Sequence, residues 1–474
     1  MSGPAPVPPG AFVTGPVVCH DAALFTDLYE LTMAASYLRE RMTGSATFSL
    51  FVRRLPPGRR FLVAAGLADA LAYLQAFRFS ETALTYLRGL DGFDDAVVSA
   101  LAGVRFSGDV RAMPEGTVFF ANEPLLEITA PIVEAQLVET AVMNACHVQT
   151  AVATKAARCV LAARGRPVVE FGLRRTPGID AGMKAARSAF IGGATSSSNV
   201  LAGLYYGVPP SGTMAHSYVQ AFPAEIDAFR AFARSFPRAT ALLLDTYDTV
   251  TAARKAVRIA REMAGRGERL GAVRLDSGDL LELSRAVRAV LDAADLRDVR
   301  IFASGGLDEQ EIERLLDAGA PIDAFGVGTR MSVAADTPVL DMAYKLVRYA
   351  GRDVMKLSAG KETWTGPKQV YRRRGGDGRL AGDLVARADE PAPGNATPLL
   401  EPVMVGGVPL GPAPSLAAIR ARCAAEVQAL PAELGRFHGP ASYTVRYSER
   451  LAETQRQLRV DLHRREVTDG GRGA

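Results

Sequence analysis

Residues 169–222 read VEFGLRRTPGIDAGMKAARSAFIGGATSSSNVLAGLYYGVPPSGTMAHSYVQAF, and the rest of the chain is organised around this stretch. An apolar, strand-like run ends in Arg174 and Arg175, whose planar guanidinium groups suit a carboxylate or a phosphate. A loop of glycine, serine and asparagine at 192–199 precedes a helical pattern, and the backbone N–H groups of such a loop can bind an oxyanion. His216 can transfer protons or accept a phosphoryl group near pH 7. Together these features predict an anion-binding site with a reactive histidine.

Strand-like apolar runs alternate with helical patterns through the middle of the chain. The predicted strands are residues 168–171, 240–244, 271–275, 299–303 and 324–327. Each strand ends in polar or glycine-rich residues, namely GLRR, DTYDT, DSGD, SGG and GTR. Buried strands followed by such loops favour a parallel α/β barrel, whose chemistry lies at the carboxyl ends of its strands. A doubly wound sheet has the same local pattern and is an alternative on pattern alone.

The two ends of the chain differ from the middle in their predicted secondary structure. They have short strands, turns and proline-rich stretches. We therefore predict an α/β barrel at 133–345, flanked by segments of α+β character at 21–132 and 346–468. The remaining segments, 1–20 and 469–474, are predicted to be disordered tails.

The composition is ordinary for a soluble globular enzyme. Of 474 residues, 48% are apolar and 22% are charged, and the net charge of +4 argues against broad nucleic-acid binding. The four cysteines form no CxxC pair, so they predict neither a disulfide framework nor a zinc site. The sequence has no signal-peptide pattern and no apolar run of membrane-spanning length, so we expect a cytoplasmic protein.

The segment VRLDSGDL contains two carboxylates, Asp276 and Asp279, around a Ser-Gly turn at a predicted strand end. Such a pair can bind ribose hydroxyls or hold Mg²⁺ through water. The same pattern is also typical of a helix N-cap, with Asp279 in the first turn. Asp245 and Asp248 follow another predicted strand, and for them a turn or cap is as good an interpretation as a functional role.

The next two loops are rich in glycine. Ser304, Gly305 and Gly306 follow one apolar strand, and Gly328 and Thr329 follow the next. Glycines at these places let backbone N–H groups reach a phosphate, and adjacent late loops of a barrel are a common phosphate site. The segment GVGTRM lacks the third glycine of a dinucleotide fingerprint, and the sequence has no P-loop motif, so ATP would bind without one.

Long strings in a fixed order, from about residue 24 to 451, resemble nicotinate phosphoribosyltransferase. They are TDLYELTM, ATKAAR, EFGLRR, SSSNVLAG, GTMAHS, RLDSGD, SGGLDE and GVGT. The resemblance implies an irregular α/β (TIM-like) barrel of the type II phosphoribosyltransferases, beside an α+β domain formed from both chain ends. It implies a reaction of nicotinate with phosphoribosyl pyrophosphate, coupled to ATP hydrolysis, with Mg²⁺ as cofactor, in the salvage route of NAD biosynthesis. It also implies a homodimer with shared active sites. From the charge balance and the lack of an apolar run of membrane-spanning length, we expect no nucleic-acid or membrane partner.

The resemblance gives roles to individual residues. His216 matches the histidine that the family phosphorylates with ATP, and we predict it to be catalytic together with Arg274 and Asp276. Tyr29, Thr213 and Arg274 match positions that contact nicotinate. The predicted substrate-binding residues are Tyr29, Arg174, Ser197, Thr213, Arg274, Asp279, Ser304, Gly305, Gly306, Gly328 and Thr329. No residue is predicted as a direct metal ligand.

Two further matches concern the phosphoribosyl group. Thr329, with the SGG loop, matches the phosphoribosyl phosphate site, and Arg174 matches an arginine that lies over the substrates. Displacing pyrophosphate from an anomeric carbon builds positive charge on the sugar. Mg²⁺ and arginine near the leaving group would be the main sources of catalysis.

A barrel isomerase or aldolase with the same phosphate loops is the second hypothesis. It would need a Schiff-base lysine or paired acid–base carboxylates at the strand ends. Lys155 and Lys255 fall within helical patterns, and Lys184 lies in the segment after EFGLRR, so no lysine is well placed for that chemistry. A non-catalytic binding protein is disfavoured by the reactive histidine.

Overall fold

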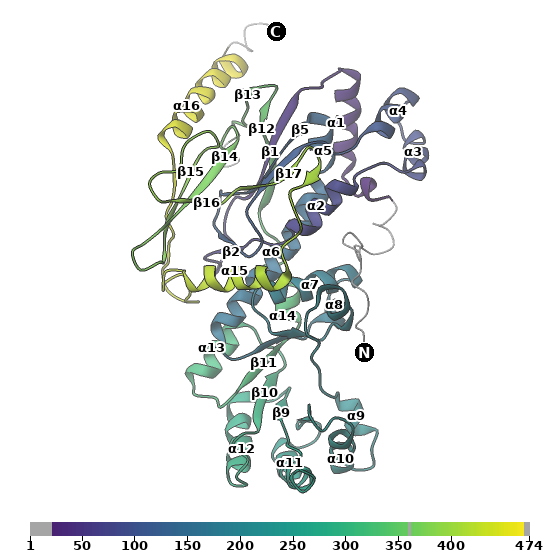
Figure 1. Ribbon diagram of the computed structural model, residues 1–474, viewed down its shortest axis with the longest axis vertical. Helices are drawn as coiled ribbons and strands as arrows, with labels where there is room; N and C mark the ends of the chain where they lie inside the picture. Colours follow the sequence, from purple (N-terminus) through teal and green to yellow (C-terminus); the bar gives the residue numbers. More distant parts are fainter. Residues whose placement is uncertain (1–20, 359–361, 469–474) are drawn as a thin grey trace. The chain divides into compact units, whose positions relative to one another are not determined.

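The computed structural model describes residues 21–358 and 362–468, which divide into two compact units (Figure 1). The barrel unit is Val152–Pro338, and the composite unit combines the chain up to Ala151 with the chain from Val339. Helix α6 (Glu139–Ala162) continues across this division, so the units divide later than the predicted boundary at 132/133. The two predicted tails lie outside the described residues. No helix in the described part of the chain is long and apolar enough to cross a membrane.

The barrel unit contains one parallel sheet of six strands in the order β7-β6-β11-β10-β9-β8. The strands are β6 (Val168–Glu170), β7 (Ser196–Ser197), β8 (Ala241–Leu243), β9 (Ala272–Leu275), β10 (Arg300–Ser304) and β11 (Ala324–Val327). The last strand, β11, pairs with the first, β6, so the order follows the sequence around a ring. Among the described residues only a ladder between β7 and β8 is missing from that ring. A strand order that follows the sequence around a ring is that of a barrel and not of a doubly wound sheet. The predicted irregular α/β barrel is therefore confirmed.

Helices follow the strands of the barrel unit, and four of them begin at a capping side chain. Asn199, Asp248, Asp279 and Asp308 each accept a hydrogen bond from a backbone N–H in the first turn of the following helix. The helices are α7 (Ile179–Ile191), α8 (Val200–Tyr206), α9 (His216–Gln220), α10 (Glu225–Ser235), α11 (Thr249–Ala264), α12 (Leu280–Asp292), α13 (Glu309–Asp317) and α14 (Thr329–Ser332). The caps fix where each strand-to-helix loop ends, and these loops carry the predicted site.

The composite unit joins both ends of the chain in one sheet. Strand β1 (Ser45–Val52) pairs antiparallel with β5 (Pro124–Pro131) on one side and with β12 (Met342–Tyr349) on the other. The seven-stranded sheet has the order β13-β12-β1-β5-β3-β17-β18, and a four-stranded sheet has the order β16-β14-β15-β19. This mixing of early and late strands confirms the α+β domain predicted from the two chain ends.

The composite unit also contains a two-stranded sheet, in which β2 pairs antiparallel with β4, and several helices. Its helices include α1 (Leu28–Arg39), α2 (Leu67–Ala76), α3 (Glu81–Arg88), α4 (Asp95–Gly103), α5 (Ile132–Leu137), α15 (Leu416–Gln428) and α16 (Glu449–His463). Its remaining strands are β2 (Leu62–Val63), β3 (Asp109–Ala112), β4 (Val118–Phe119), β13 (Arg352–Asp353), β14 (Lys368–Arg374), β15 (Leu380–Arg387), β16 (Thr397–Pro398), β17 (Glu401–Val405), β18 (Val408–Pro409) and β19 (Val445–Tyr447).

Candidate active site

Arg274, on β9, is the centre of a polar cluster at the carboxyl end of the barrel sheet. Its Nε donates to Ser304 Oγ at 2.8 Å, its Nη1 to Thr213 Oγ1 at 3.1 Å, and its Nη2 to Asp276 Oδ1 at 2.6 Å. The guanidinium also lies 5.5 Å from the centre of the Phe171 ring. Only 15% of the side chain is exposed, so three different loops hold this cation in one orientation.

Asp276 and His216 face each other across this cluster. His216 Nε2 lies 3.9 Å from Asp276 Oδ2, and His216 Nδ1 lies 3.2 Å from Thr246 Oγ1. Burial alone would raise the pKa of Asp276, but hydrogen bonds from Ser304 and Arg274 and the charge of Arg274 outweigh it and lower that pKa. Asp276 is therefore an anion at neutral pH, which suits it to binding cations and hydroxyls and not to acting as a general acid.

The structure separates the two aspartates after β8. Asp248 caps α11, where its Oδ1 accepts from Thr251 N at 2.8 Å. Asp245 instead turns toward the β9 loop, and its Oδ2 accepts from Asp276 N and from Ser277 Oγ. The other oxygen, Asp245 Oδ1, is buried and has no hydrogen-bond partner among the described residues. Asp245 therefore belongs to the cluster, which its sequence pattern alone does not reveal.

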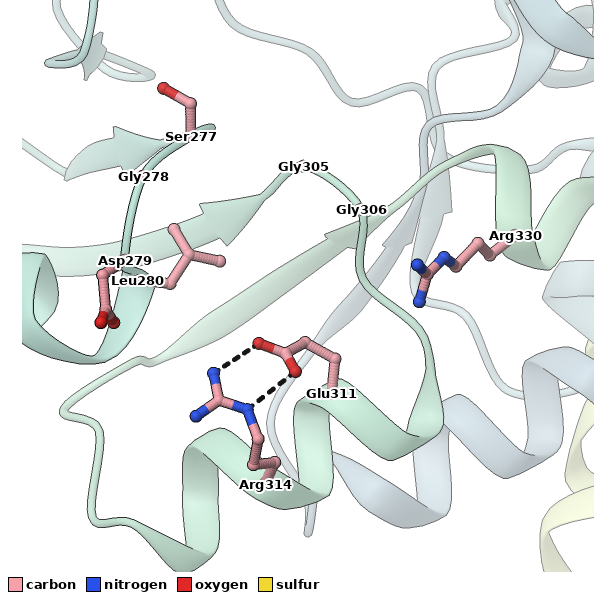
Figure 2. Close-up of a pocket in the computed structure, with 9 residues that line it drawn as sticks. All are labelled: Ser277, Gly278, Asp279, Leu280, Gly305, Gly306, Glu311, Arg314 and Arg330. Atoms are coloured by element: carbon pink, nitrogen blue, oxygen red, sulfur yellow. Dashed lines mark hydrogen bonds and ion pairs between the residues drawn. The ribbon is translucent and has the colours of Figure 1, made fainter.

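A pocket of about 340 Å³ lies beside the cluster, between α12, α13 and the loop after β10 (Figure 2). Its lining residues are Ser277, Gly278, Asp279, Leu280, Gly305, Gly306, Glu311, Arg314 and Arg330. Gly305 has a φ of +92°, and a Cβ there would come within 1.9 Å of the Asp276 carbonyl oxygen, so only glycine fits this turn. Asp279 caps α12, with its Oδ1 3.0 Å from Leu281 N, and it also lines the pocket.

The loop at 192–199 differs from the prediction. The backbone N–H groups of Ser197 and Ser198 donate to Pro209 O and Glu170 O, and that of Asn199 donates to Ser197 Oγ. These groups are therefore not available to an oxyanion in this structure. Ser197 is buried and its hydroxyl donates to Glu170 Oε2 at 2.5 Å, so its contact with a substrate remains only a prediction.

Glu170 is a buried residue that the sequence patterns did not single out. Its Oε1 accepts from Ser332 Oγ at 2.6 Å and from Gly172 N, while its Oε2 accepts from Ser197 Oγ. One carboxylate thus joins the ends of β6 and β7 to α14, the short helix after β11. The sequence signal for this network is a glutamate at the end of an apolar strand. Such a carboxylate is buried, and a buried carboxylate requires several hydrogen-bond donors around it.

The remaining barrel residues of the prediction lie on neighbouring loops. Arg174, on the 3₁₀ turn η2 (Leu173–Arg175), is exposed and makes no hydrogen bond within the described part of the chain. Its neighbour Arg175 donates to Thr329 Oγ1 at 3.4 Å, which brings the loops after β6 and β11 together. Gly328 directly precedes α14, whose first residue is Thr329. The arginines of EFGLRR and the GVGT loop therefore share one edge of the sheet.

Tyr29 lies in the composite unit, on α1, and 47% of its surface is exposed. Burial of its hydroxyl end and the charge of Glu139, to which it hydrogen-bonds, raise the pKa of Tyr29, so it is a neutral phenol at physiological pH. The next residue, Glu30, accepts from Thr140 Oγ1 at 2.5 Å and so fixes α1 beside the start of α6. An exposed aromatic on an anchored helix suits a binding role, and its predicted contact with nicotinate remains a prediction.

Glu30 should make the stability of the protein depend on pH. Burial raises the pKa of Glu30 from 4.5 to about 7. Because the folded pKa is the higher one, the stabilisation is complete below pH 4.5 and is lost as the pH rises through 7, by up to about 3 kcal/mol. We expect the denaturation midpoint to fall less between pH 5 and pH 8 in Glu30→Gln, which mimics the protonated carboxyl, than in the unsubstituted protein. Equal decreases in both proteins would contradict this assignment.

The lysines do not support a Schiff-base mechanism. The three lysines of the barrel unit are all ion-paired: Lys155 with Glu309, Lys184 with Asp180, and Lys255 with Glu225. None of these amines is a free nucleophile beside the Arg274 cluster. The structure therefore disfavours the aldolase alternative.

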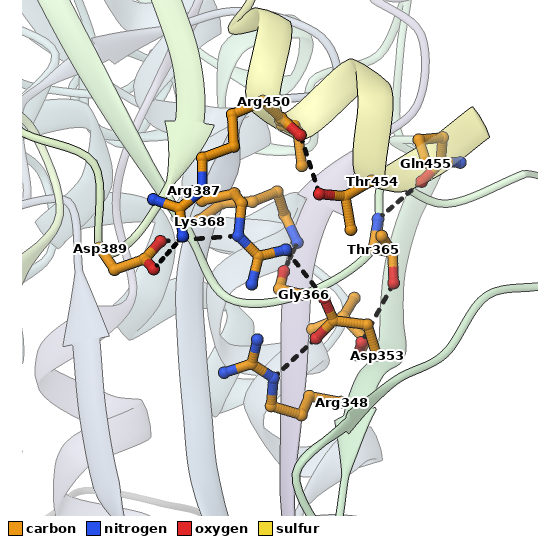
Figure 3. A network of polar contacts seen from close by, with 12 residues as sticks. Arg348, Asp353, Thr365, Gly366, Lys368, Arg387, Asp389, Arg450, Thr454 and Gln455 are labelled. Carbon is orange, nitrogen blue, oxygen red and sulfur yellow. Dashed lines mark hydrogen bonds and ion pairs between the residues drawn. The ribbon is translucent and has the colours of Figure 1, made fainter. Parts of the chain in front are cut away.

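A polar network in the composite unit contains another buried lysine (Figure 3). Burial lowers the pKa of Lys368, as nucleophilic lysines require, but its Nζ donates to the carbonyl oxygens of Gly366 and Trp364 at 2.6 and 3.1 Å. Nearby, Asp353 accepts from both Arg348 and Arg387, at 2.7 and 2.8 Å. These contacts hold strands of the composite unit together, so the network has a structural role and not a catalytic one.

Comparisons with known proteins identify the family of the chain. Models of the nicotinate phosphoribosyltransferase N-terminal and C-terminal domains match residues 24–147 and 392–455, and the quinolinate phosphoribosyl transferase C-terminal domain matches 152–345. A nicotinate phosphoribosyltransferase of Mycobacterium tuberculosis is 52% identical to this chain, and the match covers 93% of this chain and 94% of the relative. The nicotinate phosphoribosyltransferase of Bacillus subtilis is 42% identical, and the match covers 78% of this chain and 76% of the relative. The crystal structure of human nicotinic acid phosphoribosyltransferase superposes with a TM-score of 0.82 at 33% identity, covering 91% of this chain and 99% of that one. The chain therefore belongs to the nicotinate phosphoribosyltransferase family.

Proposed function

We propose that the protein joins nicotinate and 5-phosphoribosyl 1-pyrophosphate to give nicotinate mononucleotide and pyrophosphate, and that a phosphohistidine at His216 couples this reaction to ATP hydrolysis. The observation that supports it best is the convergence of Arg274, Asp276 and His216 at the carboxyl ends of the barrel strands. The proposal places the protein in the salvage of nicotinate for NAD biosynthesis. A cytoplasmic location and the absence of nucleic-acid and membrane partners remain predictions.

Arg274 supplies the means to recognise the nicotinate carboxylate. Its contacts to Ser304, Thr213, Asp276 and the carbonyl oxygen of Met214 leave one N–H of Nη2 without a partner in the described part of the chain. Thr213 Oγ1 lies 3.1 Å from Arg274 Nη1 and offers a hydroxyl beside the same cation. An oriented guanidinium and a hydroxyl are a suitable pair for a planar carboxylate.

Asp245 and Asp276 fit a Mg²⁺ ion. Mg²⁺ in phosphate-binding enzymes usually takes one or two protein carboxylates and completes its shell with water and phosphate oxygens. Asp245 Oδ1 has no partner within the described residues, and Asp276 has a lowered pKa that keeps it anionic. When bound, the ion would neutralise the charge that develops on pyrophosphate as it leaves. The two carboxylates would orient it, while Arg274 holds Asp276 in place.

His216 is accessible enough to be phosphorylated. Its side chain is 41% exposed, and Thr246 and Asp276 lie beside its two ring nitrogens. In the proposed step Nε2 attacks the γ-phosphorus of ATP, the bond to the β,γ-bridging oxygen breaks, and ADP leaves. Water later hydrolyses the phosphohistidine and releases phosphate. Because Nε2 carries the phosphoryl group, the ring proton lies on Nδ1, where Thr246 Oγ1 can accept it as a hydrogen bond.

Product formation from nicotinate, nicotinamide and quinolinate, each with and without ATP, tests the proposed function. We expect nicotinate to be preferred over nicotinamide by roughly 10- to 100-fold, because a charge-assisted contact with Arg274 contributes about 1.5–3 kcal/mol. The loop at 192–199 contains no aspartate that could accept from an amide and repel a carboxylate. ATP should increase the rate with nicotinate. Comparable turnover of nicotinate and nicotinamide, or dependence on quinolinate, would contradict the proposal.

We also propose a homodimer in which Tyr29 stacks on the pyridine ring bound to the partner chain. Phe25, Leu28 and Tyr29 are all exposed near the start of α1, and Val200 and Leu204 are exposed on α8. Exposed apolar residues in groups are typical of association surfaces. A two-fold dimer would make the exchange of Tyr29 reciprocal.

A subunit-mixing experiment tests whether Tyr29 acts in the partner's site. Tyr29→Ala and Arg274→Ala proteins should each be nearly inactive. In a mixed dimer, one site carries both lesions and the other carries neither, so activity should recover to at most half that of the unsubstituted dimer. Verified mixed dimers without any recovery would place Tyr29 in the site of its own chain or outside the site.

A further inference from the structure

Glu170 is a buried carboxylate at the point where the pairing of β6 with β11 ends. In the described part of the chain, the last backbone hydrogen bond of that pairing joins Phe171 N to Val327 O at 2.9 Å. The next backbone N–H, that of Gly172, donates instead to Glu170 Oε1. The side chain of Glu170 therefore replaces a strand partner at the residue where the chain leaves the sheet and turns toward Arg174.

The same carboxylate is bound to two other elements of the barrel unit. Its Oε1 also accepts from Ser332 Oγ on α14 at 2.6 Å, and its Oε2 accepts from Ser197 Oγ on β7 at 2.5 Å. Only 1% of Glu170 is exposed, so water does not compete for these hydrogen bonds. The carboxylate thus fixes the end of β6 relative to both β7 and α14.

The turn that begins at Gly172 packs directly on this network. A Cβ at Gly172 would lie 2.0 Å from Ser332 Oγ and 3.1 Å from Glu170 Oε1, so the backbone contacts both groups. The turn is closed by its own hydrogen bond, from Arg175 N to Gly172 O at 2.9 Å. A short closed turn moves as one piece, so a shift at Gly172 displaces the exposed Arg174 that the turn carries.

We propose that Glu170 is a positioning residue for the reaction: its carboxylate, held by Ser332 and Ser197, fixes the turn that presents Arg174 to the substrates. The inference rests on the proposed function and deepens it, because it gives a role to a group whose burial keeps it from contacting either substrate. Arg174 makes no hydrogen bond within the described part of the chain, so its place in the site depends on the backbone of the turn. A displacement of about 1 Å at such a group can lower a rate about 10²-fold.

The test is a double-mutant cycle in the full chain. Glu170→Gln keeps the size of the side chain but leaves only one of its two terminal atoms able to accept hydrogen bonds, and Arg174→Ala removes the arginine that the turn presents. The two single variants and the double variant are compared in kcat and in KM for nicotinate. Hydrogen exchange of the backbone amides at 172–176 reports the order of the turn itself. Thermal denaturation verifies that each variant is folded.

Two control variants separate positioning from a general loss of stability. Glu225→Gln makes the same substitution at another buried glutamate of the barrel unit, on α10. Ser332→Ala removes one donor to Glu170, and its control Ser284→Ala removes a buried hydroxyl of α12 that donates to a backbone carbonyl at 3.0 Å. Glu225→Gln and Ser284→Ala should change kcat less than about 2-fold, because neither side chain contacts the turn.

Glu170→Gln should lower kcat about 10- to 100-fold and change KM for nicotinate less than about 3-fold, because Arg274 still binds the carboxylate. Arg174→Ala should lower kcat about 100-fold. The double variant should be within about 3-fold of Arg174→Ala, since Glu170 has nothing to position once the arginine is removed. Ser332→Ala should lower kcat about 3- to 10-fold, with the same non-additivity toward Arg174→Ala. Exchange at 172–176 should be at least about 5-fold faster in Glu170→Gln and unchanged in Glu225→Gln.

Several results would overturn the proposal. Losses that multiply in the double variant would show that Glu170 acts independently of Arg174, and an unchanged kcat in either single variant would remove the premise. Equal non-additivity between Glu225→Gln and Arg174→Ala would indicate a general loosening of the barrel. If Glu170→Gln does not fold, the cycle of Ser332→Ala with Arg174→Ala decides by the same criteria.

Failure of the proposed function has a different signature. An unsubstituted protein that forms no nicotinate mononucleotide would refute the proposed function itself. In that case, exchange at 172–176 still decides whether Glu170 orders the turn: unchanged exchange in Glu170→Gln and in Ser332→Ala would overturn the positioning role as well.

Discussion

Replacing Arg274 with alanine is expected to lower kcat/KM for nicotinate by roughly 10²- to 10³-fold, which is the largest loss expected for a binding residue of this site. The variant removes the cation that faces the substrate carboxylate. It also leaves Asp276 without the partner that donates to it at 2.6 Å. A charge-assisted contact with the substrate contributes about 1.5–3 kcal/mol, and the uncompensated charge of Asp276 adds to this loss. The measurement is steady-state kinetics with varied nicotinate and saturating phosphoribosyl pyrophosphate.

Two control variants test whether the loss is specific to the guanidinium group of Arg274. Arg274→Lys keeps the charge but cannot contact Ser304, Thr213 and Asp276 at once, so we expect an intermediate loss of roughly 10- to 100-fold. Arg285→Ala, on the exposed side of α12, should change kcat/KM less than about 2-fold, because this arginine pairs with Glu282 at the surface. Affinity for nicotinate that is unaltered by Arg274→Ala would exclude Arg274 from the binding site.

Replacing His216 with alanine is expected to abolish ATP hydrolysis, with a fall of at least about 10³-fold, and to leave weak phosphoribosyl transfer that ATP no longer stimulates. The phosphoryl acceptor is lost, but Arg274 and the glycine turns that would bind the two substrates are intact. A nucleophile removed from a covalent mechanism typically costs several orders of magnitude. The measurements are release of phosphate from ATP and transfer of labelled γ-phosphate to the protein as an acid-labile product.

Thr246→Val is the matched control for the histidine. The substitution preserves shape and removes the hydroxyl that lies 3.2 Å from His216 Nδ1. Labelling should persist but slow by roughly 10-fold, since the ring remains present and loses only its orientation. Hydrolysis of ATP at the unsubstituted rate in His216→Ala would show that the phosphoryl group goes elsewhere.

Most of the fold could be predicted from the sequence because buried parallel strands have a strong local signal. The five predicted strands at 168–171, 240–244, 271–275, 299–303 and 324–327 correspond to β6, β8, β9, β10 and β11, with ends that differ by one residue or less. The short β7 was missed because two serines do not resemble an apolar strand. The choice between a barrel and a doubly wound sheet needed the pairing of β11 with β6, which joins residues about 160 positions apart.

The sequence predicted which residues are candidates for the site, but it did not predict which other residues they contact. Asp245 and Asp248 have similar local surroundings, yet Asp248 caps a helix and Asp245 contacts Ser277. Ser197 looked like part of an open anion-binding loop, and it is buried against Glu170. Local sequence cannot separate a capping aspartate from a ligand-binding one, because both follow a strand and precede a helix.

The sequence by itself determined the order of strands and helices, the α+β character of the two chain ends, and the loops that carry the arginines, glycines and histidine. These features follow from hydrophobic periodicity and turn residues, which act over a few positions along the chain. Only the tertiary structure decided that Arg274 bridges three loops, that Asp245 has a buried oxygen without a partner among the described residues, and that Arg330, which lines the pocket, pairs with Asp308. The physical reason is that side-chain direction, burial and charge pairing depend on neighbours brought together by folding, and these neighbours are distant in sequence.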